Sequence, residues 1–158
     1  MREIKFRAWD TSVGRMGQVW QIDWNMKQVF YYYDNESDWS ATRKAGRYCQ
    51  ELKNVILLQF TGLKDKQGKE ICEGDILSFA GNITADDSLG AEPNGFIYDE
   101  TSKHVVVWDE KEGAWFPDTT NALDNECWKY RRDTRLLMRD GKCEVIGNIY
   151  ENPELLEK

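Results

Sequence analysis

Residues 20–33 read WQIDWNMKQVFYYY, two apolar and aromatic runs joined by a short polar turn. In the first run Trp20, Ile22 and Trp24 alternate with polar residues, which is the two-residue period of a strand with unlike faces. The second run, residues 29–33, is β-branched and aromatic, a composition enriched in strands. This stretch therefore predicts a β-hairpin with aromatic pairs across its two strands.

The same patterns predict further strands on both sides of the hairpin. They cover residues 3–9, 55–60, 62–79 as two strands around a turn at Gly68, 104–108, 114–116 and 144–150, with a turn over 11–17. Helix is predicted only from Ser37 or Asp38 to Leu52, over residues 122–130, and as a last turn after Pro153. Many short strands with few helices indicate a mostly β fold, either a small barrel or a sandwich.

The chain length fits one domain, because 158 residues with 41% hydrophobic side chains can bury one continuous core. A division into two smaller parts is the alternative. It would give an N-terminal subdomain over residues 1–57 and a C-terminal barrel over 58–150. The barrel would carry a long acidic loop at 80–103, a length that is uncommon inside compact domains.

The net charge of −7 is concentrated in the middle of the chain. Residues 1–70 hold 12 basic and 9 acidic side chains, residues 71–127 hold 2 and 13, and residues 128–158 hold 7 and 6. Such a negative middle segment repels phosphates, so a nucleic acid or membrane partner would have to contact the first or last segment. No run approaches the roughly 20 apolar residues of a membrane span, and the N-terminus lacks a secretion signal, which predicts a cytoplasmic protein.

Three segments together resemble the YopX family of small proteins carried by bacteriophages and prophages. They are MREIKFRAWD at residues 1–10, LQFTGLKDKQGKEI at 58–71 continuing into EGDI at 73–76, and EVIGNIYENPELL at 144–156. The resemblance implies a predominantly β fold with small SH3-like barrel character, a phage or prophage origin and expression in bacterial cytoplasm. It implies no reaction and no catalytic residue. The acidic stretch 80–103 is longer than the connection usual in the family.

Catalytic and metal-binding motifs are absent from the sequence, so the prediction is a protein without cofactor, metal or catalytic site. The cysteines at 49, 72, 127 and 143 form no Cys-x-x-Cys pair. His104 is the one imidazole, and it is interpreted as a strand-end residue that faces solvent or packs on Trp108 rather than as a general base. The carboxylates between Glu73 and Glu126 match no calcium loop and are interpreted as solvated charge, with Gly74-Asp75 as a turn before a strand. An enzyme of unknown reaction stays an alternative.

Arg132, Arg135 and Arg139 would share one face if residues 129–139 were helical. With Trp128 and Tyr130 nearby, they could follow a phosphate backbone and stack a base, so a nucleic-acid-binding barrel is a second alternative. A solvated rim paired with nearby acids is the favoured interpretation, because no helix-turn-helix or zinc finger accompanies the cluster.

The aromatic side chains between residues 20 and 39 exceed what one face of a hairpin can bury. The surplus predicts an interaction surface, where Trp and Tyr are favoured. Its candidate residues are Trp20, Trp24, Tyr31, Tyr33 and Trp39. We therefore expect a non-catalytic module that contacts a host or phage protein or another copy of itself.

Overall fold

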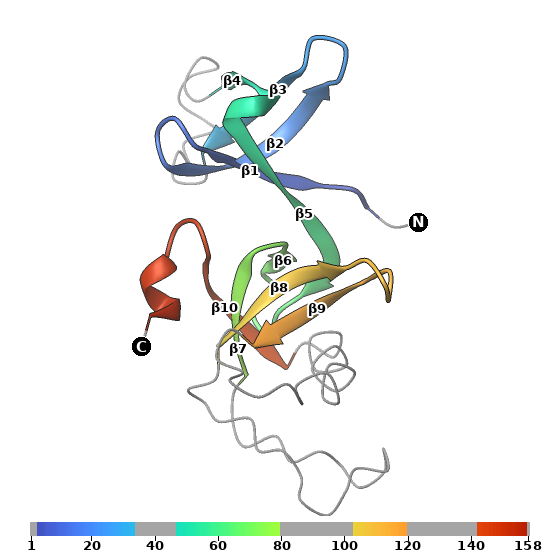
Figure 1. Ribbon diagram of the computed structural model, residues 1–158, viewed down its shortest axis with the longest axis vertical. Coiled ribbons are helices and arrows are strands. Elements are labelled where there is room, and N and C mark those ends of the chain that lie inside the picture. The colour runs from blue at the N-terminus through green and yellow to red at the C-terminus, as the bar shows by residue number, and fades with distance from the viewer. Residues whose placement is uncertain (1–2, 34–46, 80–102, 120–141, 158) are drawn as a thin grey trace, which may run out of the picture. The chain divides into compact units, whose positions relative to one another are not determined.

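The computed structural model describes residues 3–33, 47–79, 103–119 and 142–157 (Figure 1). In these residues there are ten strands: β1 (Phe6–Asp10), β2 (Arg15–Asp23), β3 (Gln28–Tyr33), β4 (Tyr48–Glu51), β5 (Val55–Lys64), β6 (Glu70–Cys72), β7 (Asp75–Phe79), β8 (Lys103–Asp109), β9 (Ala114–Thr119) and β10 (Cys143–Asn148). Two short 3-10 helices accompany them, η1 (Leu52–Asn54) and η4 (Pro153–Leu156). The mostly β fold predicted from the sequence is confirmed, as is the last helical turn after Pro153.

The chain divides into two compact units, residues 1–60 and residues 61–158. We call them unit 1 and unit 2 and describe each by itself. Strand β5 contributes its first residues to unit 1 and its last residues to unit 2.

Unit 1 is an antiparallel sheet with the strand order β4-β3-β2-β1-β5. Alternate residues of each strand point to the same side, and one side forms the core. That core contains Ala8, Val29, Tyr31, Tyr33 and Val55, with Val19, Ile22, Leu52 and Leu57 packed against it. We call this side the inner face of the sheet and the opposite side the outer face.

Strand β2 begins earlier than the sequence predicts, because Gly17 belongs to the sheet and not to the turn. Gly17 pairs with Ala8 of β1 and with Tyr33 of β3. A Cβ atom at Gly17 would lie 2.7 Å from Cδ2 of Tyr31 and 2.8 Å from the carbonyl oxygen of Tyr32. Glycine at this position therefore serves close packing against β3 rather than chain reversal.

The helix predicted up to Leu52 is wrong where the structure describes it. Residues 48–51 form strand β4, which pairs with β3 through Phe30–Cys49 and Tyr31–Tyr48. Of residues 47–54, only the three residues of η1 are helical. The start of that predicted helix, the helix over 122–130 and all but the last residue of the acidic stretch 80–103 lie outside the described residues.

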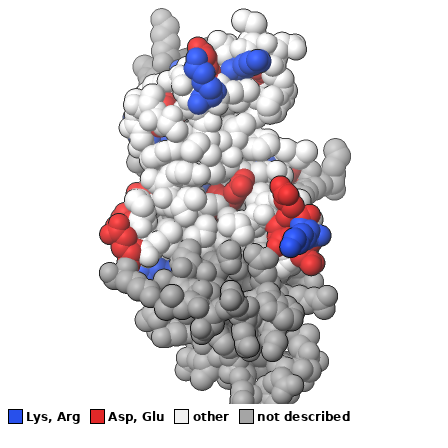
Figure 2. All heavy atoms as spheres, in the orientation of Figure 1, with Lys and Arg blue, Asp and Glu red and all other residues white. Residues whose placement is uncertain are grey.

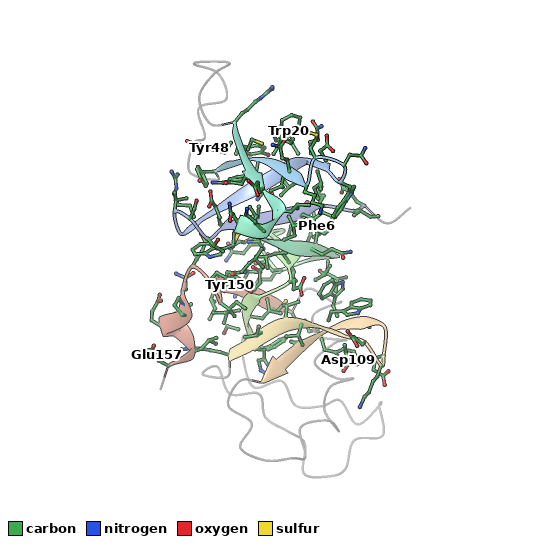
Figure 3. The ribbon with its side chains drawn as sticks, turned by 45° about the horizontal axis from the view of Figure 1, so that its top comes forward. Phe6, Trp20, Tyr48, Asp109, Tyr150 and Glu157 are labelled. Atoms are coloured by element: carbon green, nitrogen blue, oxygen red, sulfur yellow. The ribbon has the colours of Figure 1, made fainter. Side chains whose placement is uncertain are left out.

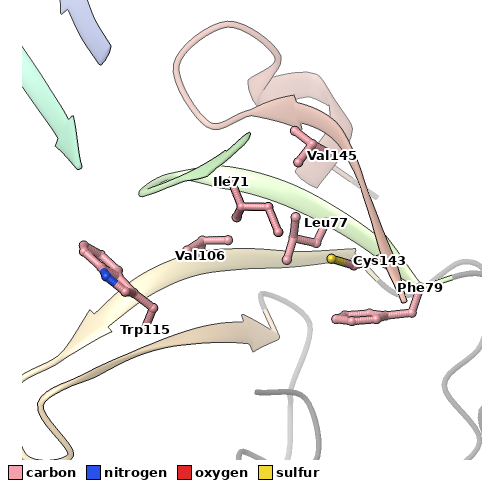
Figure 4. Close-up of a cluster of buried hydrophobic side chains, with 7 residues drawn as sticks. All are labelled: Ile71, Leu77, Phe79, Val106, Trp115, Cys143 and Val145. Carbon is pink, nitrogen blue, oxygen red and sulfur yellow. The ribbon is translucent and has the colours of Figure 1, made fainter. Parts of the chain in front are cut away.

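Unit 2 contains a second antiparallel sheet with the order β10-β7-β8-β9, and its β6 lies beside the end of β5. Thr61 of β5 donates its hydroxyl to the carbonyl of Ile71 in β6 at 2.9 Å. The core of this unit joins residues from five strands (Figure 4). They are Ile71, Leu77, Phe79, Val106, Trp115, Cys143 and Val145.

Candidate functional site

The outer face of unit 1 presents aromatic rings to solvent on β2 and β3. Strand β3 alternates, so Val29, Tyr31 and Tyr33 are buried in the core while Tyr32 is 44% exposed on the other side. Phe30 shares the outer side with Tyr32 and is partly buried. Two aromatic residues of one strand therefore lie on the same exposed face.

A β-bulge in β2 adds a third ring to this face. Val19 pairs with Tyr31 and Gln21 pairs with Phe30, so Trp20 is the extra residue between them. The centroid of the Trp20 ring lies 5.5 Å from that of Phe30 in a tilted arrangement, and Trp20 is 48% exposed. Figure 3 shows the side chains of this unit, with Trp20 of β2 and Tyr48 of β4 labelled.

Two further side chains border these rings, one directly before β4 and one in β4. The guanidinium carbon of Arg47 lies 5.3 Å from the centroid of the Trp20 ring, within cation–π range. Cys49 of β4 is an exposed free thiol directly across from Phe30, and directly opposed residues of paired strands share a face. We call Trp20, Phe30, Tyr32 and Arg47 the outer patch.

The turn between β2 and β3 ends in two exposed apolar side chains. Trp24 is 68% exposed and Met26 is 66% exposed. The carboxylate of Asp23 accepts backbone N–H groups from Asn25 and Met26, each at 2.9 Å, which fixes the turn. We call Trp24 and Met26 the hairpin tip.

The inner face of unit 1 holds a buried carboxylate, Asp10. It accepts hydrogen bonds from the hydroxyl of Tyr31, from the hydroxyl of Tyr33 at 3.2 Å, and from the backbone N–H and hydroxyl of Ser12 at 2.9 and 2.5 Å. Burial alone would raise the pKa of Asp10, but these hydrogen bonds outweigh it and lower the pKa below the ordinary value. Burial, with the neighbouring Asp10, raises the pKa of Tyr31 far above its ordinary value. At pH 7, Asp10 is therefore ionised and Tyr31 is neutral. In this state the carboxylate accepts the tyrosine hydroxyls and stabilises the core of unit 1.

Two buried carboxylates in unit 2 hold turns in the same way. Asp65 accepts backbone N–H groups from Gln67 and Lys69 at 2.8 and 2.9 Å, and from Val145 of β10 at 3.1 Å. Burial would raise the pKa of Asp65, yet the backbone hydrogen bonds lower it. Asp75 accepts the backbone N–H of Cys72 at 2.7 Å and the side-chain amide of Asn148 at 3.0 Å. These acids connect β10 to the turns of the unit.

The predicted turn at Gly74-Asp75 is confirmed, because Gly74 has a φ of 74° and β7 starts at Asp75. The interpretation of Asp75 as a solvated charge is wrong, since this side chain is fully buried. His104 is also buried, so it neither faces solvent nor packs on Trp108 as expected. Its ring packs edge-on against Phe79, with centroids 4.9 Å apart, and burial lowers its pKa to about 4.

The structure separates the residues predicted for an interaction surface. Trp20 and Trp24 are exposed, but Tyr31 and Tyr33 are core residues, because the odd positions of β3 face inward toward Asp10. The prediction that these two tyrosines form a surface is therefore corrected. Trp39 and the arginines Arg132, Arg135 and Arg139 lie outside the described residues.

Sequence reasoning missed Met26 and Arg47 as members of the exposed surface. Met26 lies in the turn between β2 and β3, and only its exposed fraction in the structure identifies it as a surface residue. Arg47 is placed against Trp20 by the pairing of β4 with β3, which no local sequence signal predicts. Within residues 3–33, 47–79, 103–119 and 142–157, no three His, Cys, Asp or Glu side chains gather as a metal site. No helix in these ranges is long and apolar enough to cross a membrane.

Comparison with known proteins gives a family match over nearly the whole chain. The model of the family described as YopX protein matches residues 5–157. The crystal structure of protein EF1440 from Enterococcus faecalis is similar with a TM-score of 0.55 and 25% identity, covering 99% of this chain and 100% of that one. A catalase-peroxidase from Rhodococcus erythropolis is 33% identical over 92 residues, which are 58% of this chain and 11% of that protein. Since the chain spans only about a tenth of that enzyme, this match carries no function over.

Proposed function

We propose, for a chain that belongs to the YopX protein family, that it works as a non-catalytic module binding another protein chain. The binding surface is the outer patch with the hairpin tip, both on unit 1. We also propose that the protein comes from a phage or prophage, that it acts in bacterial cytoplasm, and that its fold has SH3-like barrel character.

One observation carries the proposal: Trp20 and Tyr32 lie exposed on one face of a sheet whose other face is a packed core. Trp, Tyr, Met and Arg are the residue types enriched at protein interfaces and at their energetic centres. The outer patch and hairpin tip contain all four types. Burying such rings in water-free contact is favourable, because aromatic side chains offer large apolar area at low entropic cost.

The buried acids support a structural rather than a catalytic interpretation of the remaining polar residues. Asp10, Asp65 and Asp75 each accept hydrogen bonds from named groups within their own unit. A general acid or base has to reach a substrate, and these carboxylates are instead enclosed by the chain. An enzyme is therefore the least supported alternative.

A nucleic acid partner has one favourable observation, the stacking of Arg47 on Trp20. Base stacking on aromatic rings with a cation beside them is the mode of single-strand binders. Affinity for a phosphate backbone, however, grows with the number of cations that contact it. The outer patch contains a single cation, so a protein partner is favoured.

Site-specific photocrosslinking tests the proposal. Tyr32 is replaced by p-benzoylphenylalanine, the chain is produced in bacteria that carry the phage or prophage, and the cells are irradiated. We expect covalent adducts that contain a second polypeptide. The control places the same group at Val13, which is exposed in unit 1 between β1 and β2 and outside the outer patch. Equal adduct yields from both positions, or none from position 32, would contradict the proposal.

A further inference from the structure

Resting on the proposed function, we infer that the outer patch binds the outer patch of a second copy of this chain. A two-fold symmetric contact needs a surface complementary to itself, since the same residues lie on both sides. The outer patch meets this condition, because three of its four members are uncharged rings on a β-sheet face. Its arginine stacks on a tryptophan already, and the same contact is available to a partner's ring.

The exposed apolar area is close to what a stable dimer requires. With aromatic side chains offering about 150–250 Å² each, the exposed parts of Trp20 and Tyr32 amount to roughly 200 Å². Trp24 and Met26, in the turn between β2 and β3, bring the exposed apolar area of this hairpin to roughly 400 Å². An ordinary interface buries about 800 Å² per partner, a little over half of it apolar. Polar residues of β2, β3 and β4 around the rings supply the remainder.

The outer face is more exposed toward the β4 edge of the sheet than toward β1 and β5. Across the strands from Tyr32, the paired residues are Gln18, Arg7 and Leu58 in turn. Gln18 is half-buried, and both Arg7 and Leu58 are buried. Along this row, the outer face is exposed at β3 and becomes buried toward β1 and β5, which locates the proposed contact on the side of β2, β3 and β4.

The distribution of charge also favours pairing through unit 1. Residues 1–60 carry 9 basic and 7 acidic side chains, whereas residues 61–158 carry 12 and 21. The surface of unit 1 seen in Figure 2 consists mostly of uncharged residues. A contact between two unit 1 surfaces joins the nearly neutral parts of two acidic chains, so it meets less repulsion than any contact through unit 2.

Sedimentation velocity of the purified full chain across concentration tests the inference. We expect a dimer with a Kd in the micromolar range, and a Kd raised about 100-fold or more by Trp20→Ser with Tyr32→Ser. Val13→Ser is the matched control and should leave the Kd unchanged. A wild-type chain that stays monomeric, or a dimer unaffected by the double variant, overturns the inference. If photocrosslinking at position 32 still captures a different protein, the proposed function survives that result.

Crosslinking through Cys49 gives a readout that leaves the outer patch intact. Cys49 is exposed on the outer face, whereas Cys72 and Cys143 are buried. In a Cys127→Ser chain, a short bismaleimide should convert the dimer to a covalent species that disappears with Cys49→Ser. Absence of that species at concentrations where the chain is dimeric overturns the inference. A monomer that binds a labelled oligo-dT strand at low salt through Trp20 also overturns it, in favour of single-stranded nucleic acid.

Discussion

Asp10 joins two strands of unit 1, β1 and β3, through hydrogen bonds between residues far apart in the sequence. Its carboxylate belongs to β1, and the tyrosine hydroxyls that it accepts belong to β3, 21 and 23 residues away. Arg15 stacks on the Tyr33 ring with its guanidinium carbon 3.8 Å from the centroid, and Tyr48 lies 4.3 Å from the same ring. The tyrosines that look like surface aromatics in the sequence are thus held inward by a buried charge.

Replacing Asp10 by Asn should lower the free energy of unfolding by about 2 kcal/mol, because hydrogen bonds to a charged group contribute about 1.5–3 kcal/mol each and the amide retains part of them. Both tyrosine hydroxyls donate to Oδ2 of Asp10, and both Ser12 donors bond Oδ1, so the single oxygen of the Asn amide can keep only one of these two pairs of hydrogen bonds. Urea unfolding followed by near-UV circular dichroism measures the change. Ser12→Ala, which removes one hydroxyl donor at an exposed residue, should cost less, and an unchanged midpoint for Asp10→Asn would refute the role assigned to this carboxylate.

His104 should make unit 2 sensitive to mild acid. Burial lowers its pKa in the folded chain to about 4 from 6.5, so the unfolded chain takes up the proton first as the pH falls. The free energy of unfolding does not depend on His104 above pH 6.5, and it falls by roughly 3 kcal/mol in total as the pH drops from 6.5 to 4. Urea unfolding at pH 7.5, 6, 5 and 4 measures the slope. His104→Leu should flatten the slope in this window, and an equally steep slope in that variant would exclude His104 as its cause.

The strand periodicity of the sequence predicts most described elements, and its errors have physical causes. Strands β1, β2, β3, β5, β8 and β9 follow the alternation or apolar runs that predict them. Strand β4 does not, because YCQE has no strand pattern and becomes extended through its ladder with β3. Likewise, the run VFYYY predicts a strand without revealing which of its faces is inward. Of the residues that the sequence predicts for a surface, Trp20 and Trp24 are exposed, whereas Tyr31 and Tyr33 are buried.

The last helical turn of unit 2 packs against β10 at Gly147. A Cβ atom there would lie 2.6 Å from Cδ1 of Leu155 and 2.8 Å from the side-chain oxygen of Asn152. Lys103 of β8 adds a hydrogen bond from its ammonium group to the carbonyl of Leu155. Helix η4 is thus fastened to two strands of the same sheet.

Gly147→Ala should detach η4 and destabilise unit 2 by about 1–3 kcal/mol, the usual cost of overpacking. Hydrogen exchange of the Asn152 amide, which donates to the carbonyl of Asn148 at 2.8 Å, reports the detachment. Leu155→Ala removes the clashing methyl group, so the double variant should lose less stability than the two single changes summed. Strict additivity would mean that Gly147 and Leu155 do not contact each other.

At the scale of the whole molecule, the two units differ more in charge than in fold. Both are built from antiparallel sheets, yet the acidic excess of the chain lies entirely within residues 61–158. The segments that resemble the YopX family supply the turns at Asp65 and Asp75 and the β10 contacts of unit 2, and they supply the first strand of unit 1. The family pattern in this chain thus describes its scaffold, while the outer patch lies in residues that the resemblance does not include.

The response to salt separates self-association from nucleic acid binding. Two copies of a chain with a net charge of −7 repel each other, and this repulsion opposes a dimer formed through apolar rings. Raising NaCl from about 0.1 M to about 1 M shortens the Debye length from about 10 Å to about 3 Å, so we expect the dimer Kd to fall about two- to fivefold. Sedimentation velocity at both concentrations measures it. Binding to a phosphate backbone responds to salt in the opposite way: its Kd rises, because added salt competes with every contact between a cationic side chain and a phosphate. An association weakened by salt would therefore mean that charge, rather than the rings of the outer patch, holds the complex together.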